Sequence, residues 1–148
     1  MPQHKPVIAE LPEPEEIDFG ALAREYLDGQ VDLIVVLGPT ASGKTRYAVQ
    51  LANEINACAA LGLFEGCPGR MTDAPVIDGA EIISADSRQV YKGMDIGTGK
   101  DLSEYGDVPY HLIDILPAGA QYNVFQYQQD FRRVWADIRS RNMVPILC

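Results

Sequence analysis

One run of eight residues has the composition of a phosphate-binding loop. Residues 38–45 read GPTASGKT, which fits the pattern GxxxxGK[ST]. Glycines let the backbone curl so that successive N–H groups point at an anion, and a helix that starts there adds partial positive charge. Lys44 supplies a mobile charge for outer phosphate oxygens, and the Thr45 hydroxyl suits a Mg²⁺ ion held by the phosphates. We therefore expect a diphosphate or polyphosphate, not specifically ATP, on Gly38, Pro39, Thr40, Ala41, Ser42, Gly43, Lys44 and Thr45.

A second polar run follows the apolar segment 81–85 (EIISA) and comprises Asp86, Ser87, Arg88 and Gln89. If each polar run follows a strand, and the two strands are parallel members of one sheet, the two runs meet where the strands end. There the Asp86 carboxylate is suited to holding a metal or to acting as a general base, or it caps the next helix. The Gln89 and Ser87 side chains suit the edge of a nucleobase, and Arg88 suits a phosphate.

The elements around these runs alternate between strand and helix patterns. A continuous apolar run, Val31 to Leu37, is typical of a strand buried on both faces of a parallel sheet. The expected elements that follow are a helix from Gly43, strands at 81–85 and 111–115, a helix from the N-cap Asn123 to about Arg141, and a strand at 143–147. This order predicts an α/β fold with a parallel sheet, of the three-layer type found in P-loop NTPases. The last strand should be central, so a chain that stops at Cys148 should lack part of its site.

The chain of 148 residues suits one domain, with 47% hydrophobic and 22% charged residues. Residues 1–30 form an acidic leader with seven acidic and two basic residues, partly flexible but with a short helix expected at 17–28, and residues 31–148 form the core. The net charge of −9 argues against a protein that coats nucleic acid generally. No apolar run is long enough to span a membrane and no secretory signal is visible, so a cytoplasmic location is expected.

Other polar residues have modest expected roles. The three cysteines are widely spaced and the two histidines lie far apart, so no zinc site is expected, and Cys58 and Cys148 are interpreted as buried thiols. His111 is expected to serve as a cap or in the core. Lys92 and Lys100 flank a glycine-punctuated loop, where they contact RNA phosphate or simply face solvent.

Four blocks, GPTASGKT, IISADSRQVYKGMDIGTGK, VPYHLIDI and VPILC, occur in this order over roughly residues 31–148. Together they closely resemble the N-terminal half of the tRNA dimethylallyltransferases (tRNA isopentenyltransferases). The DSRQVYKGMDIGT block makes the resemblance specific, because generic P-loop kinases do not carry it.

In that family a dimethylallyl group moves from dimethylallyl diphosphate to N6 of the adenosine 3′ to the anticodon. The resemblance implies that the phosphate loop holds the diphosphate of the prenyl donor, with Mg²⁺ near Thr45. It also implies that Asp86 accepts the proton from the adenosine amino group, and that Thr40 contacts the bridging or leaving oxygen of the diphosphate. The remaining implied contacts to the tRNA anticodon loop come from Asp86, Ser87, Arg88 and Gln89.

The sequence departs from the family in three ways. Family members continue past the last strand into a glycine-rich turn and helices that grip the anticodon stem-loop, so this chain alone is expected to be inactive. The connection at 56–80 is longer than usual, and the leader 1–30 lies outside the resemblance. Three alternatives stay open: an adenylate isopentenyltransferase that uses free adenine nucleotide, a small-molecule P-loop kinase with Asp86 as its base, and a non-catalytic nucleotide-binding module.

Overall fold

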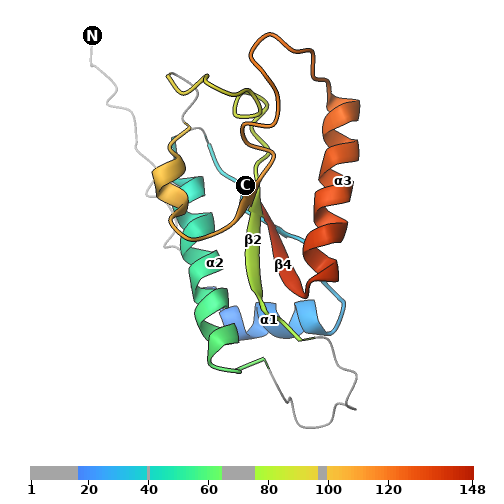
Figure 1. The fold of residues 1–148 in the computed structure, drawn as a ribbon. Helices are drawn as coiled ribbons and strands as arrows, with labels where there is room; N and C mark the ends of the chain where they lie inside the picture. Colours follow the sequence, from blue (N-terminus) through green and yellow to red (C-terminus); the bar gives the residue numbers. More distant parts are fainter. Residues whose placement is uncertain (1–16, 40, 65–75, 97–99) are drawn as a thin grey trace, which may run out of the picture.

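A computed structural model describes residues 17–39, 41–64, 76–96 and 100–148. In these residues strands alternate with helices, and helices α2 and α3 flank strands β2 and β4 (Figure 1). The elements, in chain order, are α1 (Phe19–Leu27), β1 (Ile34–Val35), α2 (Lys44–Ala60), β2 (Gly79–Ile83), the 3₁₀ helix η1 (Leu102–Tyr105), β3 (Tyr110–His111), α3 (Val124–Ser140) and β4 (Met143–Leu147). The predicted α/β class is confirmed.

The strands form one parallel sheet in the order β1-β4-β2-β3. The longest pairing joins β2 to β4, with Gly79 opposite Met143 and Ile83 opposite Leu147. Strand β4 is therefore central, as the sequence predicted. Because all the pairings are parallel, the segments that follow β1, β2 and β4 leave the sheet at the same edge.

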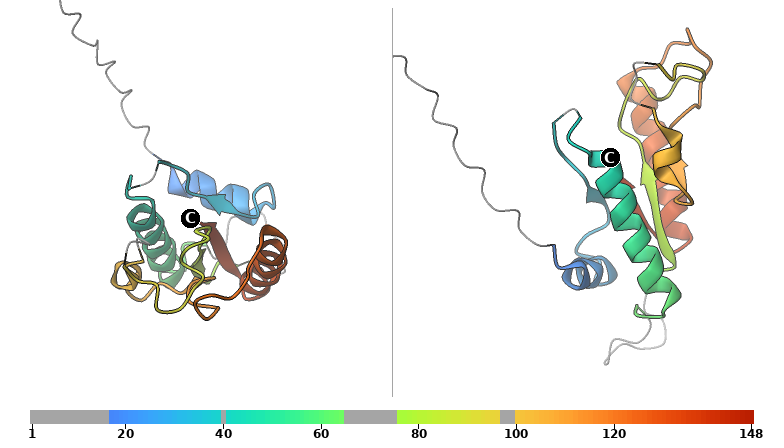
Figure 2. Two further views of the ribbon diagram at one scale, coloured as in Figure 1. Left: turned by 90° about the horizontal axis from the view of Figure 1, so that it is seen from above. Right: turned by 90° about the vertical axis from the view of Figure 1, so that its left-hand side faces the viewer.

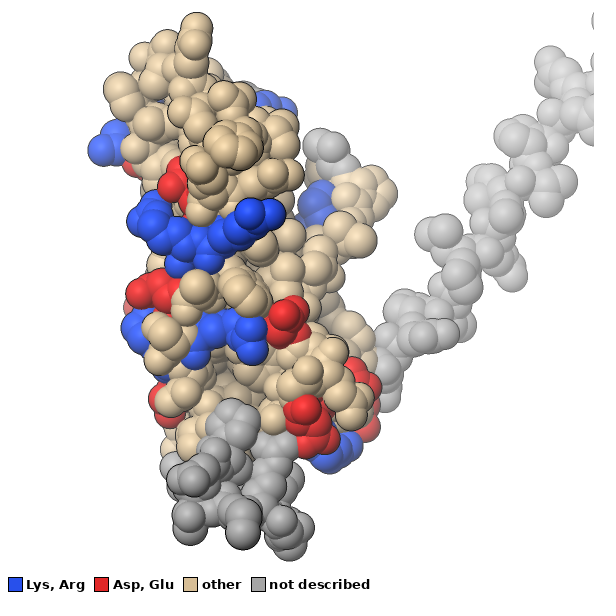
Figure 3. Space-filling model, turned by 90° about the vertical axis from the view of Figure 1, so that its right-hand side faces the viewer, with Lys and Arg blue, Asp and Glu red and all other residues tan. Residues whose placement is uncertain are grey.

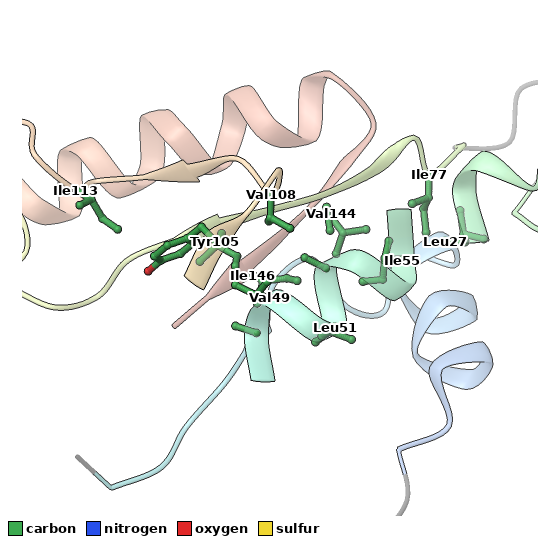
Figure 4. Packing of buried hydrophobic residues seen from close by; sticks show 14 residues of the cluster. Leu27, Val49, Leu51, Ile55, Ile77, Tyr105, Val108, Ile113, Val144 and Ile146 are labelled. Atoms are coloured by element: carbon green, nitrogen blue, oxygen red, sulfur yellow. The ribbon is translucent and has the colours of Figure 1, made fainter. Parts of the chain in front are cut away.

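Alternating side chains of the strands divide the core between two faces of the sheet. Ile82 and Ile146 face the larger cluster, which includes residues of α1, α2 and η1, whereas Ile83 packs with Val134 and Ile138 of α3. Figure 2 shows α2 and α3 on opposite sides of the strands, and Figure 4 shows the larger cluster. The arrangement is the expected three layers, and burial of these aliphatic side chains is its main source of stability.

Helix α3 begins where the sequence predicted it to begin. The Asn123 side chain accepts from the Gln126 backbone N–H, and the Gln126 side chain accepts from the Asn123 N–H, both at 3.0 Å. This reciprocal capping box satisfies two N–H groups that would otherwise lack partners at the helix start. The predicted helix at 17–28 also forms, as α1.

Strand β1 is shorter and more exposed than the sequence predicted. Only Ile34 and Val35 of the apolar run Val31 to Leu37 form a strand, and Val35 and Leu37 are 45% and 85% exposed. The expectation of burial on both faces is wrong because, among the residues that the structure describes, β1 is an edge strand that pairs with β4 alone.

Two other strand boundaries also differ from the prediction. Strand β2 covers 79–83 rather than 81–85, and β3 covers 110–111 rather than 111–115. Leu112 and Asp114 have φ angles of +63° and +55°, which are incompatible with a continuing strand. Residues 87–90 form a turn, so Asp86, for which a helix cap was one expected role, precedes a turn. Residues 1–16 of the leader and 65–75 of the connection lie outside the described residues. Among the described residues, no helix is long and apolar enough to cross a membrane.

Candidate functional site

A cleft of about 740 Å³ lies at the edge of the sheet where β2 and β4 end. It brings the two polar runs of the sequence together, although some forty residues separate them along the chain. The residues that line it are Ala41, Ser42, Gly43, Lys44, Thr45, Ser84, Ala85, Asp86, Ser87, Arg88, Gln89, Glu104, Tyr105 and Cys148. Gly38 and Pro39 are not among these lining residues, and Thr40 lies outside the described residues.

The phosphate loop is tightly wound and leads directly into α2. A Cβ atom at Gly38 would lie 2.8 Å from Ser42 Oγ, so a side chain here would have to displace the Ser42 hydroxyl. Gly43 has φ +83° and directly precedes α2, a left-handed conformation that glycine adopts without strain. The Lys44 ammonium donates to the Pro39 carbonyl at 2.7 Å, across the loop. Gly43, Lys44 and Thr45 line the cleft, so the start of α2, whose first N–H groups have no partners within the helix, lies at the cleft.

Asp86 forms a compact pair with Arg88 on the opposite wall. Asp86 Oδ1 accepts from the Arg88 backbone N–H at 2.9 Å and from Nε at 3.2 Å, and Oδ2 accepts from Nη2 at 3.0 Å. Partial burial raises the pKa of Asp86, but the hydrogen bonds from Arg88 and the charges of Arg88 and Lys44 outweigh it and leave the pKa below its ordinary value. Asp86 therefore caps a turn as a carboxylate, and the expected guanidinium–phosphate role of Arg88 requires this pair to open.

Gln89 is held from inside the fold rather than projecting freely. It is 8% exposed, and its side-chain oxygen accepts from Ser84 Oγ at 3.0 Å. The Ser84 carbonyl in turn accepts from the Tyr127 hydroxyl of α3 at 3.1 Å. The Gln89 backbone N–H donates to the Asp86 carbonyl at 3.1 Å and closes the turn. One wall of the cleft is thus tied to β2 and α3.

Tyr105, at the end of η1, is a cleft residue that sequence reasoning missed. The side chain is 4% exposed, its ring lies 4.7 Å from the ring of Tyr110, and Figure 4 shows it among the core residues. Burial raises the pKa of Tyr105 to about 12, although a hydrogen bond with the Thr45 side chain lowers it. No spacing in the sequence indicates this contact, because η1 reaches α2 only through the tertiary fold.

Cys148 and Glu104 complete this part of the lining. Cys148 is a free, half-buried thiol; burial raises its pKa, and a hydrogen bond with Thr45 lowers it. Thr45 therefore contacts two protein groups while it faces the cleft. Within the described residues, no group of three or more His, Cys, Asp or Glu side chains is arranged to hold a metal.

The remaining polar candidates lie away from this lining. His111 Nε2 lies 2.6 Å from Oε2 of Glu81, in agreement with the expected role in the core. Lys100, expected to meet RNA or solvent, has a side chain that is only 1% exposed. Both expectations for Lys100 are wrong because its ammonium donates hydrogen bonds to acceptors inside the protein.

Arginines gather on the face that carries α3, but acids lie among them. Figure 3 shows Lys and Arg side chains in bands across this face, with Asp and Glu beside them. Arg133 pairs with Asp130 at 2.9 Å, and Arg141 pairs with Asp137 at 2.9 Å. This face therefore has mixed charge rather than the uniform positive charge typical of a nucleic-acid footprint.

Comparisons with known proteins point to one family. A family model described as IPP transferase matches residues 89–148. tRNA dimethylallyltransferase 2 of Syntrophotalea carbinolica is 53% identical over 116 residues, which cover 78% of this chain and 31% of the relative. The tRNA dimethylallyltransferase 2 of Shewanella sediminis has the same identity over the same length and the same two coverages.

Solved structures agree in fold. The tRNA Δ(2)-isopentenylpyrophosphate transferase of Staphylococcus epidermidis matches with a TM-score of 0.60 and 36% identity, over 78% of this chain and 31% of that one. A eukaryotic dimethylallyltransferase acting on tRNA matches with a TM-score of 0.60 and 27% identity, over 78% of this chain and 23% of that one. The chain thus spans about a third of the bacterial relatives, less than the half that the sequence predicted.

Proposed function

We propose that this chain, which is related to the tRNA dimethylallyltransferases over most of its length, carries the diphosphate-binding loop and the general base of a tRNA-prenylating transferase. The observation that carries the proposal is the cleft itself, where Lys44 and Thr45 share one lining with Asp86 and Gln89. A loop built to hold a leaving diphosphate therefore lies next to a carboxylate suited to accept a proton from the attacking group. The prenyl donor is dimethylallyl diphosphate, and the acceptor is N6 of an adenosine in a tRNA anticodon loop.

The reaction forms one C–N bond and breaks one C–O bond. The adenosine nitrogen attacks the allylic carbon, the C–O bond to the diphosphate breaks, and the leaving oxygen keeps the electron pair. Backbone N–H groups at the start of α2 and the Lys44 ammonium stabilise the charge that builds up on that oxygen. Asp86 accepts the proton that the nitrogen loses. Thr40 is assigned, through the resemblance, to the bridging or leaving oxygen.

The Asp86–Arg88 pair must open for this proton transfer. Both carboxylate oxygens of Asp86 accept hydrogen bonds from Arg88, whose side chain is 57% exposed. An ion pair this exposed contributes only about 0–1 kcal/mol, so an incoming ligand displaces it at little cost. The released guanidinium is then free for a phosphate of the RNA backbone.

Mg²⁺ is proposed as the cofactor, held by the diphosphate and Thr45. Mg²⁺ typically uses one or two protein oxygens together with phosphate oxygens and water, so it does not need a cluster of three acidic side chains. The Thr45 hydroxyl and the Glu104 carboxylate are oxygen donors in the lining, and both fit this role. When bound, the ion supplies further positive charge for the leaving diphosphate.

The acceptor adenosine has to leave its stack to reach Asp86. Extruding a base costs a few kcal/mol and costs least in a loop or single strand, which fits an anticodon loop as the substrate. The side chains proposed to contact the extruded adenosine are Asp86, Ser87, Arg88 and Gln89. Gln89 is held by Ser84 and so presents a fixed rather than an adaptable surface.

Calorimetric titration in Mg²⁺ tests the proposal, after circular dichroism has shown that the chain is folded. Wild type is titrated with dimethylallyl diphosphate and with ATP, and Lys44→Ala and Lys92→Ala are compared. We expect tighter binding of the prenyl diphosphate, lost in Lys44→Ala and retained in Lys92→Ala, because Lys92 lies outside the cleft lining. Preference for ATP would refute the prenyltransferase and favour the kinase alternative.

A further inference from the structure

The ammonium of Lys100 is enclosed by three acceptors from two parts of the chain, the segment from Tyr91 to Asp95 and Asp114. Its Nζ donates to the Tyr91 carbonyl at 2.7 Å, to Asp95 Oδ1 at 3.3 Å, and to Asp114 Oδ1. A lysine ammonium has three N–H donors, so this group is fully satisfied. With its side chain 1% exposed, Lys100 is a cross-link within the protein rather than a surface charge.

The energetic importance of this cross-link follows from burial. A buried charge is costly unless it is paired and hydrogen-bonded, so removing the acceptors or the ammonium leaves an unmatched group. Burial lowers the pKa of Lys100, but the hydrogen bonds to Asp114 and Asp95 outweigh it, and the group stays protonated at neutral pH. Asp114 has φ +55°, a backbone conformation that is uncommon outside glycine and needs support from its neighbours.

Asp114 connects this cross-link to the cleft. Its backbone N–H donates to the Gln89 carbonyl at 3.0 Å, and the Gln89 N–H donates to the Asp86 carbonyl at 3.1 Å. The next residues extend the contact, since the N–H groups of Ile115 and Leu116 both donate to the Val90 carbonyl. A continuous set of hydrogen bonds therefore runs from the Lys100 ammonium through Asp114 to the turn that carries the proposed general base.

We propose that Lys100 is a positioning residue for the acceptor side of the cleft, because its ammonium fixes Asp114 and Asp114 fixes the turn from Asp86 to Gln89. The functional meaning of this placement rests on the proposed function, in which Asp86 is the base. The phosphate loop on the opposite wall is outside this set of hydrogen bonds. Loss of Lys100 should therefore disturb one wall of the cleft and leave the other intact.

The test compares Lys100→Met with Lys92→Met, which changes a lysine of the same loop that is exposed. Amide hydrogen exchange followed by NMR should show the Asp114 and Gln89 amides exchanging about tenfold faster or more in Lys100→Met, with amides of α2 unchanged. The carboxyl carbon of Asp86, titrated by NMR, should show its pKa rising toward the ordinary value of about 3.9, because the turn that presents it to Arg88 forms less completely. Lys92→Met should change neither measurement.

A second variant, Asp114→Asn, keeps the proposal testable if Lys100→Met does not fold. The amide retains an oxygen acceptor but lacks the charge, so the same amides should respond in the same direction by a smaller factor. Unchanged exchange at Gln89 and an unchanged Asp86 titration in a folded variant would overturn the proposal, as would uniformly faster exchange across α2 and β4. Neither measurement uses a ligand, so failure of wild type to bind dimethylallyl diphosphate would refute the proposed function separately.

Discussion

Arg141→Met probes a buried charge that the core depends on. Glu81 lies on the interior strand β2 with a side chain only 5% exposed, and Arg141 donates to both of its oxygens, at 2.5 and 2.9 Å. His111 contacts the same carboxylate at 2.6 Å, and Asp137 accepts from Arg141 at 2.9 Å. Removing the guanidinium leaves a carboxylate inside the protein for which the described residues offer only His111 as a polar partner.

The expected loss is about 2–3 kcal/mol of unfolding free energy at pH 7.5. Breaking a buried ion pair typically costs 3–5 kcal/mol, and we take a value below that range because Arg141 itself is 44% exposed. Arg133→Met is the matched control, because Arg133 lies on the same helix with an ion pair of similar length but is 74% exposed. A surface pair of this kind contributes about 0.5 kcal/mol or less.

The loss should also depend on pH. Hydrogen bonds from Arg141 lower the pKa of Glu81 in the folded protein, in spite of burial, which raises it. A lowered carboxyl pKa contributes stability above the unfolded value of about 4.3, and this contribution disappears as the pH falls through the folded pKa. The difference between wild type and Arg141→Met should therefore be greatest near neutral pH and shrink below about pH 4.

Urea unfolding at pH 7.5 and pH 3, followed by circular dichroism, measures these differences. Adding Glu81→Gln to Arg141→Met removes the unmatched charge and should recover part of the loss. Equal effects of Arg141→Met and Arg133→Met at pH 7.5, or a loss that is the same at both pH values, would refute the argument from buried charge.

Two further substitutions test the cleft. Tyr105→Phe removes the hydroxyl that hydrogen-bonds with Thr45 and should weaken Mg²⁺-dependent binding of inorganic pyrophosphate by about two- to tenfold, the value of one neutral hydrogen bond. Tyr110→Phe, a change in the ring tilted by 46° against that of Tyr105, should leave the affinity unchanged. Equal affinities of wild type and Tyr105→Phe by calorimetry would contradict this role of the Tyr105 hydroxyl. Arg88→Gln should raise the pKa of Asp86, measured by NMR titration of its carboxyl carbon. The unfolding free energy should change by less than about 1 kcal/mol, because the ion pair is exposed. An unchanged pKa of Asp86 would show that Arg88 does not hold the carboxylate in its ionised form.

Local sequence patterns, such as a helix cap or a run of apolar residues, predicted most of the fold. The cap at Asn123 forms the expected helix start, and the apolar run at Met143–Leu147 is the central strand. The exposed edge position of Val35 was not predicted, because an apolar run looks the same whether one strand or two pair with it. Strand β3 ended early because Leu112 has a positive φ, which a leucine in the sequence does not indicate.

The same distinction applies to the cleft. The phosphate loop and the run from Asp86 to Gln89 carry local signals, and parallel topology predicted that they meet. Tyr105 and the buried position of Lys100 carry none, because each depends on a contact made across the fold. Lysine usually faces solvent, so the burial of Lys100 becomes visible only with the positions of Asp114 and the Tyr91 carbonyl.

The hydrogen bond from Lys44 to the Pro39 carbonyl makes the loop selective for charge. Any ligand oxygen that takes the ammonium has to replace an acceptor that is already 2.7 Å away and neutral. Hydrogen bonds to ionised oxygens are roughly twice as strong as those between neutral groups, so only an anionic oxygen gains much by the exchange. In the proposed function, an uncharged prenyl alcohol, formed when the donor loses its diphosphate, therefore competes poorly for Lys44, and the intact donor is favoured over this hydrolysis product.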